Sequence, residues 1–223
     1  MKKNKIQKNL YVSQKKIFLK NEGNAYFLRN KYENKIFKKD LLTKSIIKKL
    51  TFSKKKNILE IGCGNAERLN FLKKNFTNNN YFGIDPSSDA IKFGKKLNSK
   101  LNLKIGDASK LKFNDNKFDI VIFGFCLYLC DDDDLYRISS ECYRVLKNNG
   151  FIIIQDFISA KVIYNNYHHH KNIKSRKMNY IKMFDWHPKI KLEKKMKYIN
   201  KGEKKITENF ITIAVLKKSF KYQ

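Results

Sequence analysis

Short apolar runs alternate with segments of helical period over residues 57–156 of the chain. The runs are short enough to be buried strands, and apolar residues three and four apart are typical of helices that lie with one face on a sheet. This alternation predicts a parallel sheet covered by helices. The expected strands are Asn57–Ile61, Tyr81–Ile84, Leu101–Ile105, Phe118–Phe123 and Gly150–Asp156, and the expected helices are Glu67–Asn75, Asp89–Leu97 and Leu135–Leu146.

The flanking segments follow other patterns. Leu41–Leu50 has apolar residues at helical spacing, so residues 1–50 are interpreted as an N-terminal helical cap. Lys191–Lys201 and Thr207–Lys217 alternate like two antiparallel strands, and the second is apolar on both faces. A polar and aromatic insertion, residues 159–190, precedes them. No internal repeat or Gly-, Pro- or Ser-rich linker divides residues 1–223, so we expect one domain of the α/β class.

The formal net charge of +29 points first to a nucleic acid or an anionic membrane as partner. Phosphate and base recognition favours arginine, yet 44 of the 49 cationic side chains are lysine. Asn, Ile and Phe are abundant as well, and all these residue types have AT-rich codons. The composition therefore favours codon bias over a dedicated polyanionic partner.

The four cysteines form no C-x-x-C pair, and lysines interrupt every apolar stretch near the N-terminus. We therefore expect no secretory signal, a reduced state and a cytoplasmic location. The longest apolar run, Ile120–Cys130, is too short for a bilayer, which needs roughly 20 apolar residues. Cys126 and Cys130 within it are interpreted as small buried hydrophobes.

Two glycines directly after the first expected strand indicate a ligand site. Gly62 and Gly64 allow a tight turn with positive φ, and the helix that follows offers free N–H groups. Glu67 replaces the third glycine of a dinucleotide motif, and no G-K-[ST] triphosphate motif exists. Asp85 ends the second strand, where a carboxylate binds ribose hydroxyls, and Asp107 follows the third, near an adenine. The pattern fits a ligand with ribose, adenine and a compact zwitterion; each carboxylate taken alone could instead serve a helix cap or a turn.

Five motifs in this order resemble those of class I S-adenosylmethionine-dependent methyltransferases: Glu60-Ile-Gly-Cys-Gly-Asn, Gly83-Ile-Asp-Pro-Ser, Gly106-Asp-Ala, Phe118-Asp-Ile-Val and Arg144 to Gly150. The resemblance covers residues 57–156 and implies a Rossmann-like, seven-stranded, mostly parallel sheet with helices on both faces and an antiparallel last strand. Ala66 and Asn149 stand where the family has glycine.

The resemblance also implies S-adenosylmethionine as cofactor and assigns the residues that bind it. Glu60, Gly62, Cys63, Gly64 and Asn65 would hold the methionine part, Asp85 with Pro86 the ribose, Asp107 with Ala108 the adenine, and Phe123, Gly124 and Phe125 would line the cofactor face.

Methyl transfer from a sulfonium is an in-line displacement that depends on holding the acceptor near the methyl group, and a base helps an oxygen acceptor. The candidates for acceptor contact or base are Tyr128, after the fourth strand, and His168 and His169 in the insertion, which resembles an acceptor-binding segment. The histidine run could equally be a solvated loop or an incidental metal binder. Asn21–Asn30, with aromatics beside an isolated arginine, is interpreted as a segment that closes over cofactor or acceptor.

A small-molecule acceptor, methylated at oxygen or nitrogen, is the preferred hypothesis, with a sugar or polysaccharide precursor as one candidate. The only prolines are Pro86 and Pro188, which excludes the Pro-Pro and Pro-Cys motifs of DNA amino- and cytosine-C5-methylating enzymes. An RNA methyltransferase that uses lysines as a phosphate track remains an alternative, as does a cofactor-binding module without transfer activity. No metal is expected, and the oligomeric state is left open.

Overall fold

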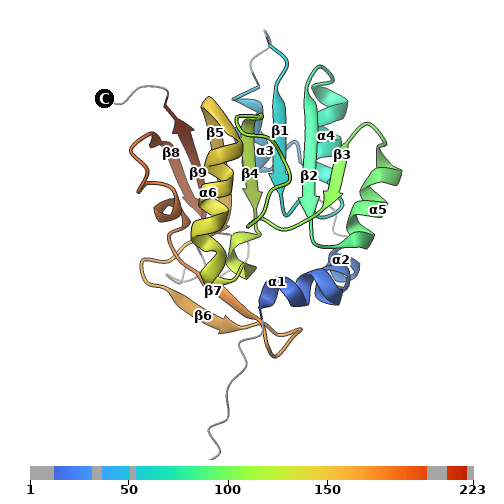
Figure 1. Cartoon of the computed structure of the whole chain (residues 1–223), viewed down its shortest axis with the longest axis vertical. Coiled ribbons are helices and arrows are strands. Elements are labelled where there is room, and N and C mark those ends of the chain that lie inside the picture. The colour runs from blue at the N-terminus through green and yellow to red at the C-terminus, as the bar shows by residue number, and fades with distance from the viewer. Residues whose placement is uncertain (1–12, 32–36, 51–53, 200–209, 220–223) are drawn as a thin grey trace, which may run out of the picture.

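A seven-stranded sheet forms the centre of the computed structural model, which describes residues 13–31, 37–50, 54–199 and 210–219 (Figure 1). The strands are β1 Asn57–Ile61, β2 Asn80–Asp85, β3 Asn102–Ile105, β4 Phe118–Gly124, β5 Leu146–Phe157, β8 Ile190–Tyr198 and β9 Ile211–Lys218. Their order is β3-β2-β1-β4-β5-β9-β8. The first five are parallel, and β9 runs antiparallel between β5 and β8. This is the predicted Rossmann-like arrangement, including its antiparallel last strand.

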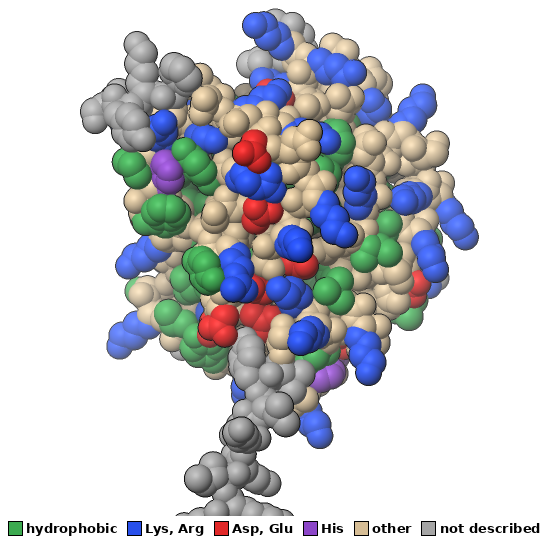
Figure 2. Space-filling model, in the orientation of Figure 1, with side chains coloured by type: hydrophobic (Ala, Val, Ile, Leu, Met, Phe, Trp, Pro, Cys, Tyr) green, Lys and Arg blue, Asp and Glu red, His purple; other side chains and the backbone are tan. Residues whose placement is uncertain are grey.

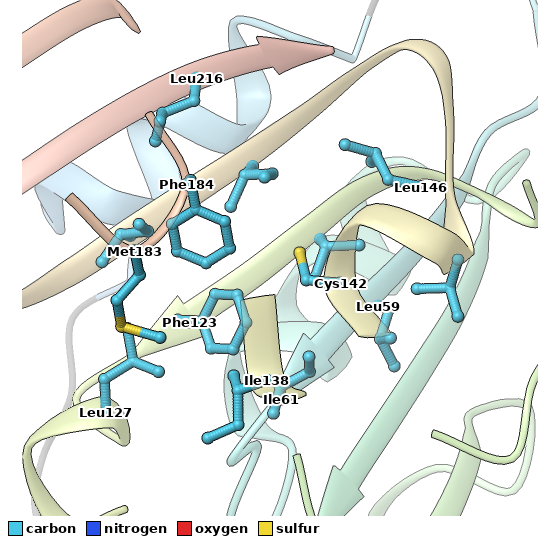
Figure 3. Packing of buried hydrophobic residues seen from close by; sticks show 14 of the residues in the cluster. Leu59, Ile61, Phe123, Leu127, Ile138, Cys142, Leu146, Met183, Phe184 and Leu216 are labelled. Carbon is cyan, nitrogen blue, oxygen red and sulfur yellow. The ribbon is translucent and has the colours of Figure 1, made fainter. Parts of the chain in front are cut away.

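Helices cover both faces of the sheet. Helices α3 (Leu41–Ile47), α4 (Glu67–Asn75) and α5 (Ser88–Leu97) pack on one face, and α6 (Leu135–Val145) covers the other with the 3-10 helix η4 (Tyr180–Met183). Figure 3 shows the second face, where apolar side chains from the strands meet those of α6 and η4. Because β1 and β4 are buried on both faces, they are apolar almost throughout.

Two helix starts are fixed by side chains that accept backbone hydrogen bonds. Asp40 accepts from the Thr43 N–H at the start of α3, and Ser87 accepts from the Ala90 N–H at the start of α5. Helix α4 begins differently, because Ala66 before it has a left-handed φ of 59°. The chain therefore turns sharply from β1 into α4 without the glycine that usually permits it.

A helix of three parts lies across the carboxyl ends of the strands. Its parts are α1 (Gln14–Ile17), a π-helical turn η1 (Phe18–Glu22) and α2 (Gly23–Asn30), and Figure 1 shows α1 and α2 beyond the arrowheads of β2 and β3. A separate two-stranded hairpin, β6 (Ile163–Asn166) and β7 (Lys174–Lys177), lies beside α1. Lys174 N–H donates to Gln14 Oε1 at 2.5 Å, which ties the hairpin to the helix.

The core elements lie within two residues of the predicted boundaries except at β5, which begins at Leu146 and not at Gly150. The chain passes directly from α6 into extended structure there. The predicted C-terminal strands are β8 and β9, while positions 200–201 and 207–209 of that prediction lie outside the described residues, as do 1–12 and 32–36 of the predicted cap. Within the described ranges, no helix is long and apolar enough to cross a membrane.

Candidate functional site

A cavity of about 620 Å³ lies at the carboxyl edge of the sheet, a size typical of sites for small ligands. Strand ends form its floor, the turn after β4 forms one wall, and the α1–α2 helix contributes the opposite side. Of the predicted site residues, those that line it are Glu60, Gly62, Cys63, Gly64, Asn65, Asp85, Pro86, Asp107, Ala108, Gly124, Phe125 and Tyr128.

The glycine turn after β1 is held against β2 and leaves open space beside it. Gly62 N–H and Cys63 N–H both donate to Ile84 O, at 2.9 and 3.1 Å. Gly62 has φ 70°, and a Cβ there would meet Cys126 Cβ at 2.5 Å, so no side chain fits. Gly64 has φ 54°, and apart from its chain neighbours no residue has an atom within 4 Å of where its Cβ would be. A ligand therefore has direct access to the backbone at Gly64.

Asp85 lies at the end of β2 with its carboxylate turned to the glycine turn. Its Oδ2 accepts from Gly64 N–H at 2.8 Å and its Oδ1 from Ser87 N–H at 2.9 Å. Burial raises the pKa of Asp85 to about 6, although both hydrogen bonds act in the opposite direction. Each carboxylate oxygen has a second lone pair, so Asp85 keeps the capacity to accept from ligand hydroxyls.

Lys15 of α1 meets a group of carboxylates at the end of the cavity near β3. Its Nζ lies 2.8 Å from Asp134 Oδ2 and 4.0 Å from Asp107 Oδ1. Burial alone would lower the pKa of Lys15, but the hydrogen bond to Asp134 and the nearby carboxylates outweigh it and raise the pKa. No sequence motif distinguishes this lysine from the other lysines of the chain.

A second charged group lines the cavity near Gly124 at the end of β4. Arg68 of α4 donates to Glu60, and its Nε lies 3.5 Å from Asp40 Oδ2. Nearby, the side-chain amide of Gln155 donates to Tyr198 Oη at 2.5 Å, and its buried Oε1 has no hydrogen-bond partner among the described residues. Arg68 and Gln155 line the cavity and were not predicted. The scarcity of arginine, five residues in the chain, was the one available signal for Arg68.

The electrostatic character of the cavity is opposite to that of the chain. The chain has 49 cationic and 20 acidic side chains. Among the residues that the structure describes, two cations, Lys15 and Arg68, line the cavity, together with seven carboxylates: Asp40, Glu60, Glu67, Asp85, Asp107, Asp131 and Asp134. Such a lining favours a ligand that carries positive charge or many hydrogen-bond donors.

The turn after β4 brings aromatic and sulfur-containing side chains to the cavity. Phe125 has a left-handed φ of 56°, an uncommon conformation for an aromatic residue that clusters at functional sites. Tyr128 Oη lies 3.5 Å from Tyr26 Oη, and its ring packs edge-on against Phe157 at 5.2 Å. Burial, and then the neighbouring Tyr26, raise the pKa of Tyr128 well above its usual value. The phenol therefore stays protonated and is suited to donate a hydrogen bond.

Three predicted residues do not line the cavity. Phe123 is fully buried in the core beneath α6, 5.9 Å from the ring of Phe184 (Figure 3), because its side chain leaves β4 on the α6 face. His168 and His169 are exposed in the turn between β6 and β7, and the His169 ring lies edge-on to Tyr167 at 5.3 Å. The interpretation of these three as cofactor or acceptor contacts has no support in the geometry.

The stretch Asn21–Asn30 lies where it was expected, against the cavity. Gly23, Tyr26 and Phe27 line it. A Cβ on Gly23 would lie 3.1 Å from Ser87 N, so this glycine lets the helix approach the end of β2 closely. Arg29 Nη2 donates to Glu22 Oε1 at 2.5 Å and to Tyr167 Oη at 2.9 Å, which links the helix to the β6–β7 turn.

Comparison with known proteins finds relatives of the core. Residues 59–154 match the family model described as a methyltransferase domain. A fatty-acid O-methyltransferase of Mycolicibacterium smegmatis is 32% identical over 103 residues, 45% of this chain and 37% of that protein. A demethylmenaquinone methyltransferase of Thermotoga maritima is 30% identical over 103 residues, 45% of this chain and 43% of that protein. The matched segment thus spans less than half the length of either relative.

The fold agrees with this match. A SAM-dependent methyltransferase structure from Methanosarcina mazei superimposes with a TM-score of 0.62 at 18% identity and covers 79% of this chain and 98% of that chain. In this fold, the three motifs that begin at Glu60, Gly83 and Gly106 lie at the carboxyl ends of β1, β2 and β3 and line the cavity. Residues 59–154 thus match a methyltransferase-domain family model, and the chain has the Rossmann-like fold of the Methanosarcina mazei structure.

Proposed function

We propose that this chain binds S-adenosylmethionine in the cavity and transfers its methyl group to a small-molecule acceptor at an oxygen or nitrogen atom. The observation that carries the proposal is the arrangement of Gly64 and Asp85. The backbone at Gly64 faces open space, and the Asp85 carboxylate beside it retains lone pairs for ribose hydroxyls. The excess of carboxylates in the lining also suits a ligand that carries a sulfonium and an ammonium.

The residues present fit the parts of this cofactor. Asp85 would accept from the ribose and Asp107 from the adenine amino group, while Glu60 and Gln155 offer oxygen acceptors at the end where the methionine ammonium would lie. Arg68 is a candidate partner for its carboxylate. When bound, the cofactor supplies a methyl group on a positively charged sulfur, a good leaving group for in-line displacement.

Positioning is the main contribution we infer for the chain's own residues. Aromatic side chains of Tyr26, Phe125, Tyr128 and Phe157 enclose one part of the cavity and would exclude water from an acceptor. Tyr128, protonated, would orient the acceptor through a donated hydrogen bond; it is a poor base because its pKa is raised. The relatives are named for a fatty acid and for demethylmenaquinone, which supports an acceptor with an apolar body. A sugar precursor remains a prediction.

Cofactor binding is tested by thermal denaturation with saturating S-adenosylmethionine or its demethylated product. We expect both to raise the melting temperature of the parent. At a ligand concentration 100 times Kd, binding adds about 2.7 kcal/mol to the free energy of unfolding. Asp85→Asn should remove most of this shift. Asp185→Asn, the same change at an exposed position, should leave it intact. Absence of any shift in the parent would refute the proposal.

The acceptor is sought by incubating a metabolite extract and total RNA separately with protein and methyl-labelled cofactor. We expect label in a small molecule. On the face seen in Figure 2, lysine and arginine side chains are spread widely with acidic side chains between them, so no single patch there marks an RNA track. Label only in RNA would establish the alternative, with a steep salt dependence of binding. Cofactor binding without transfer to either pool would indicate a binding module.

A further inference from the structure

Two buried ionisable side chains, an aspartic acid and an arginine, hold the same short turn beside the cavity. Asp156 at the end of β5 is 0% exposed, and Arg176 on β7 is 3% exposed. Neither lines the cavity. Between them lies η2 (Leu127–Leu129), the 3-10 turn that follows β4 and carries Tyr128.

Asp156 binds the turn through its N–H groups. Its Oδ2 accepts from Leu127 N–H at 3.0 Å and from Tyr128 N–H at 3.3 Å, while its Oδ1 accepts from Phe157 N–H at 2.8 Å. The amides of Leu127 and Tyr128 are the first of the one-turn helix η2 and have no partner within the turn itself. The carboxylate therefore satisfies donors that burial would otherwise leave unpaired.

Arg176 binds the same turn through its carbonyl groups. Its Nη2 donates to Leu127 O at 3.1 Å, and its Nη1 donates to Cys130 O at 3.3 Å and to Asp132. Leu127 is thus held at its N–H by a carboxylate and at its C=O by a guanidinium. Because Arg176 comes from the β6–β7 hairpin, the hairpin is joined to the turn as well as to the α1–α2 helix.

Burying two charges is costly unless they make several hydrogen bonds, and an apolar pair would often serve stability as well. Hydrogen bonds to both ends of one residue instead fix the orientation of the turn. Tyr128, directly after Leu127, then presents its phenol to Tyr26 and the cavity. A site held by such supporting contacts keeps its geometry to within a fraction of an ångström.

We propose that Asp156 and Arg176 are positioning residues that act through Tyr128: they hold the Leu127–Leu129 turn so that the phenol faces the acceptor part of the cavity. The proposal rests on the function proposed above. In this proposal the β6–β7 hairpin supports the turn after β4 through the hydrogen bonds of Arg176. The histidines at the turn of the hairpin have no role in it.

Hydrogen exchange tests the positioning without any assay of transfer. In the full-length chain, Asp156→Asn and Arg176→Lys should speed exchange of the Leu127 and Tyr128 amides at least tenfold, while the Gly64 amide, held by Asp85, keeps the parent rate. Arg137→Lys, at an exposed arginine that pairs with Asp134, is the matched control and should change neither. Unchanged protection at Leu127 and Tyr128 in both variants overturns the proposal, whether or not the parent binds the cofactor.

Transfer to the acceptor found with labelled cofactor tests the link to Tyr128. Each variant should lower kcat about tenfold or more, with the Kd of S-adenosylhomocysteine within about twofold of the parent. Tyr128→Phe combined with Arg176→Lys should lose little more than Tyr128→Phe alone, because both changes remove the same orientation. Fully additive losses, or loss of cofactor binding in step with kcat, would mean that the two residues serve the fold only. A parent that binds no cofactor would instead refute the proposed function and leave the exchange result standing.

Discussion

Two residues adopt the left-handed backbone conformation at positions where the methyltransferase motif has glycine. Ala66, before α4, has φ 59°, and Asn149, early in β5, has φ 62°. Asparagine tolerates this region better than alanine, since its short polar side chain bonds locally. Ala66 and Asn149 therefore keep the left-handed backbone conformation that glycine adopts easily, although neither residue is glycine.

Asn149 allows a direct measurement of that cost because its side chain is exposed. We expect Asn149→Ala to lower the free energy of unfolding by about 1 kcal/mol, and Asn149→Gly to keep or raise it. Urea unfolding at neutral pH measures both. Asn148→Ala, the same exchange at an exposed neighbour, should change the free energy of unfolding by less than about 0.5 kcal/mol. Equal losses for Asn148→Ala and Asn149→Ala would show that backbone strain at Asn149 is negligible.

The residues that the sequence identified at the cavity are those that stand in motifs. Gly62, Gly64 and Asp85 were predictable because a strand, a tight turn and a helix start must follow one another within a few residues. Lys15 and Gln155 reach the same cavity from segments without a motif, so only tertiary packing could reveal them. His168 and His169 were predicted because imidazole can act as a base. That property does not indicate where in the fold a histidine lies.

At the scale of elements, periodicity predicted the sheet and its covering helices because their apolar faces repeat clearly. The β6–β7 hairpin had no such signal: its strands are largely exposed, and it is held through polar contacts such as that of Lys174 with Gln14. No sequence signal predicted the π-helical turn η1 either. Turns of this kind are frequent at functional sites, and this one contributes Phe18 and Leu19 to the cavity.

The α1 helix begins with a cap supplied from a distant segment. Asp131 accepts from Gln14 N–H at 2.8 Å, from Lys15 N–H at 2.9 Å and from Ser13 Oγ at 2.9 Å. A carboxylate in this place satisfies amides at the helix start and suits the positive end of the helix dipole. Because Asp131 follows the turn after β4, it fixes the helix to the wall on the far side of the cavity.

We expect Asp131→Ala to loosen this helix by about 1 kcal/mol, which corresponds to roughly fivefold faster exchange of the Gln14 and Lys15 amides. Amides of α4 should keep the parent rate, because that helix packs on the sheet independently. Asp133→Ala removes an exposed carboxylate of the same segment and should have no effect on α1. Equal exchange rates in Asp131→Ala and Asp133→Ala would show that the cap contributes nothing to holding the helix.

At the scale of the whole molecule, composition predicted a positively charged surface but not where the negative charge lies. Seven carboxylates of the described residues, spread from Asp40 to Asp134 in the sequence, are brought together by the fold to line one cavity. One of them, Asp134, lies far from Lys15 in the sequence, and the two form an ion pair only because α1 crosses the sheet edge. The cavity lining is therefore mainly acidic, whereas the chain as a whole is strongly basic.

An excess of 29 positive charges on 223 residues should also destabilise the folded chain through self-repulsion, a penalty that salt reduces. Exposed ion pairs such as Lys49–Glu193 would lose strength in salt, but such pairs contribute little. We therefore expect the melting temperature to rise as NaCl increases from about 0.05 M to about 0.5 M, where the Debye length falls well below 10 Å. Sucrose at matched osmolarity separates screening from solvent exclusion. A melting temperature that falls over this range would mean that attraction between paired charges outweighs the net repulsion.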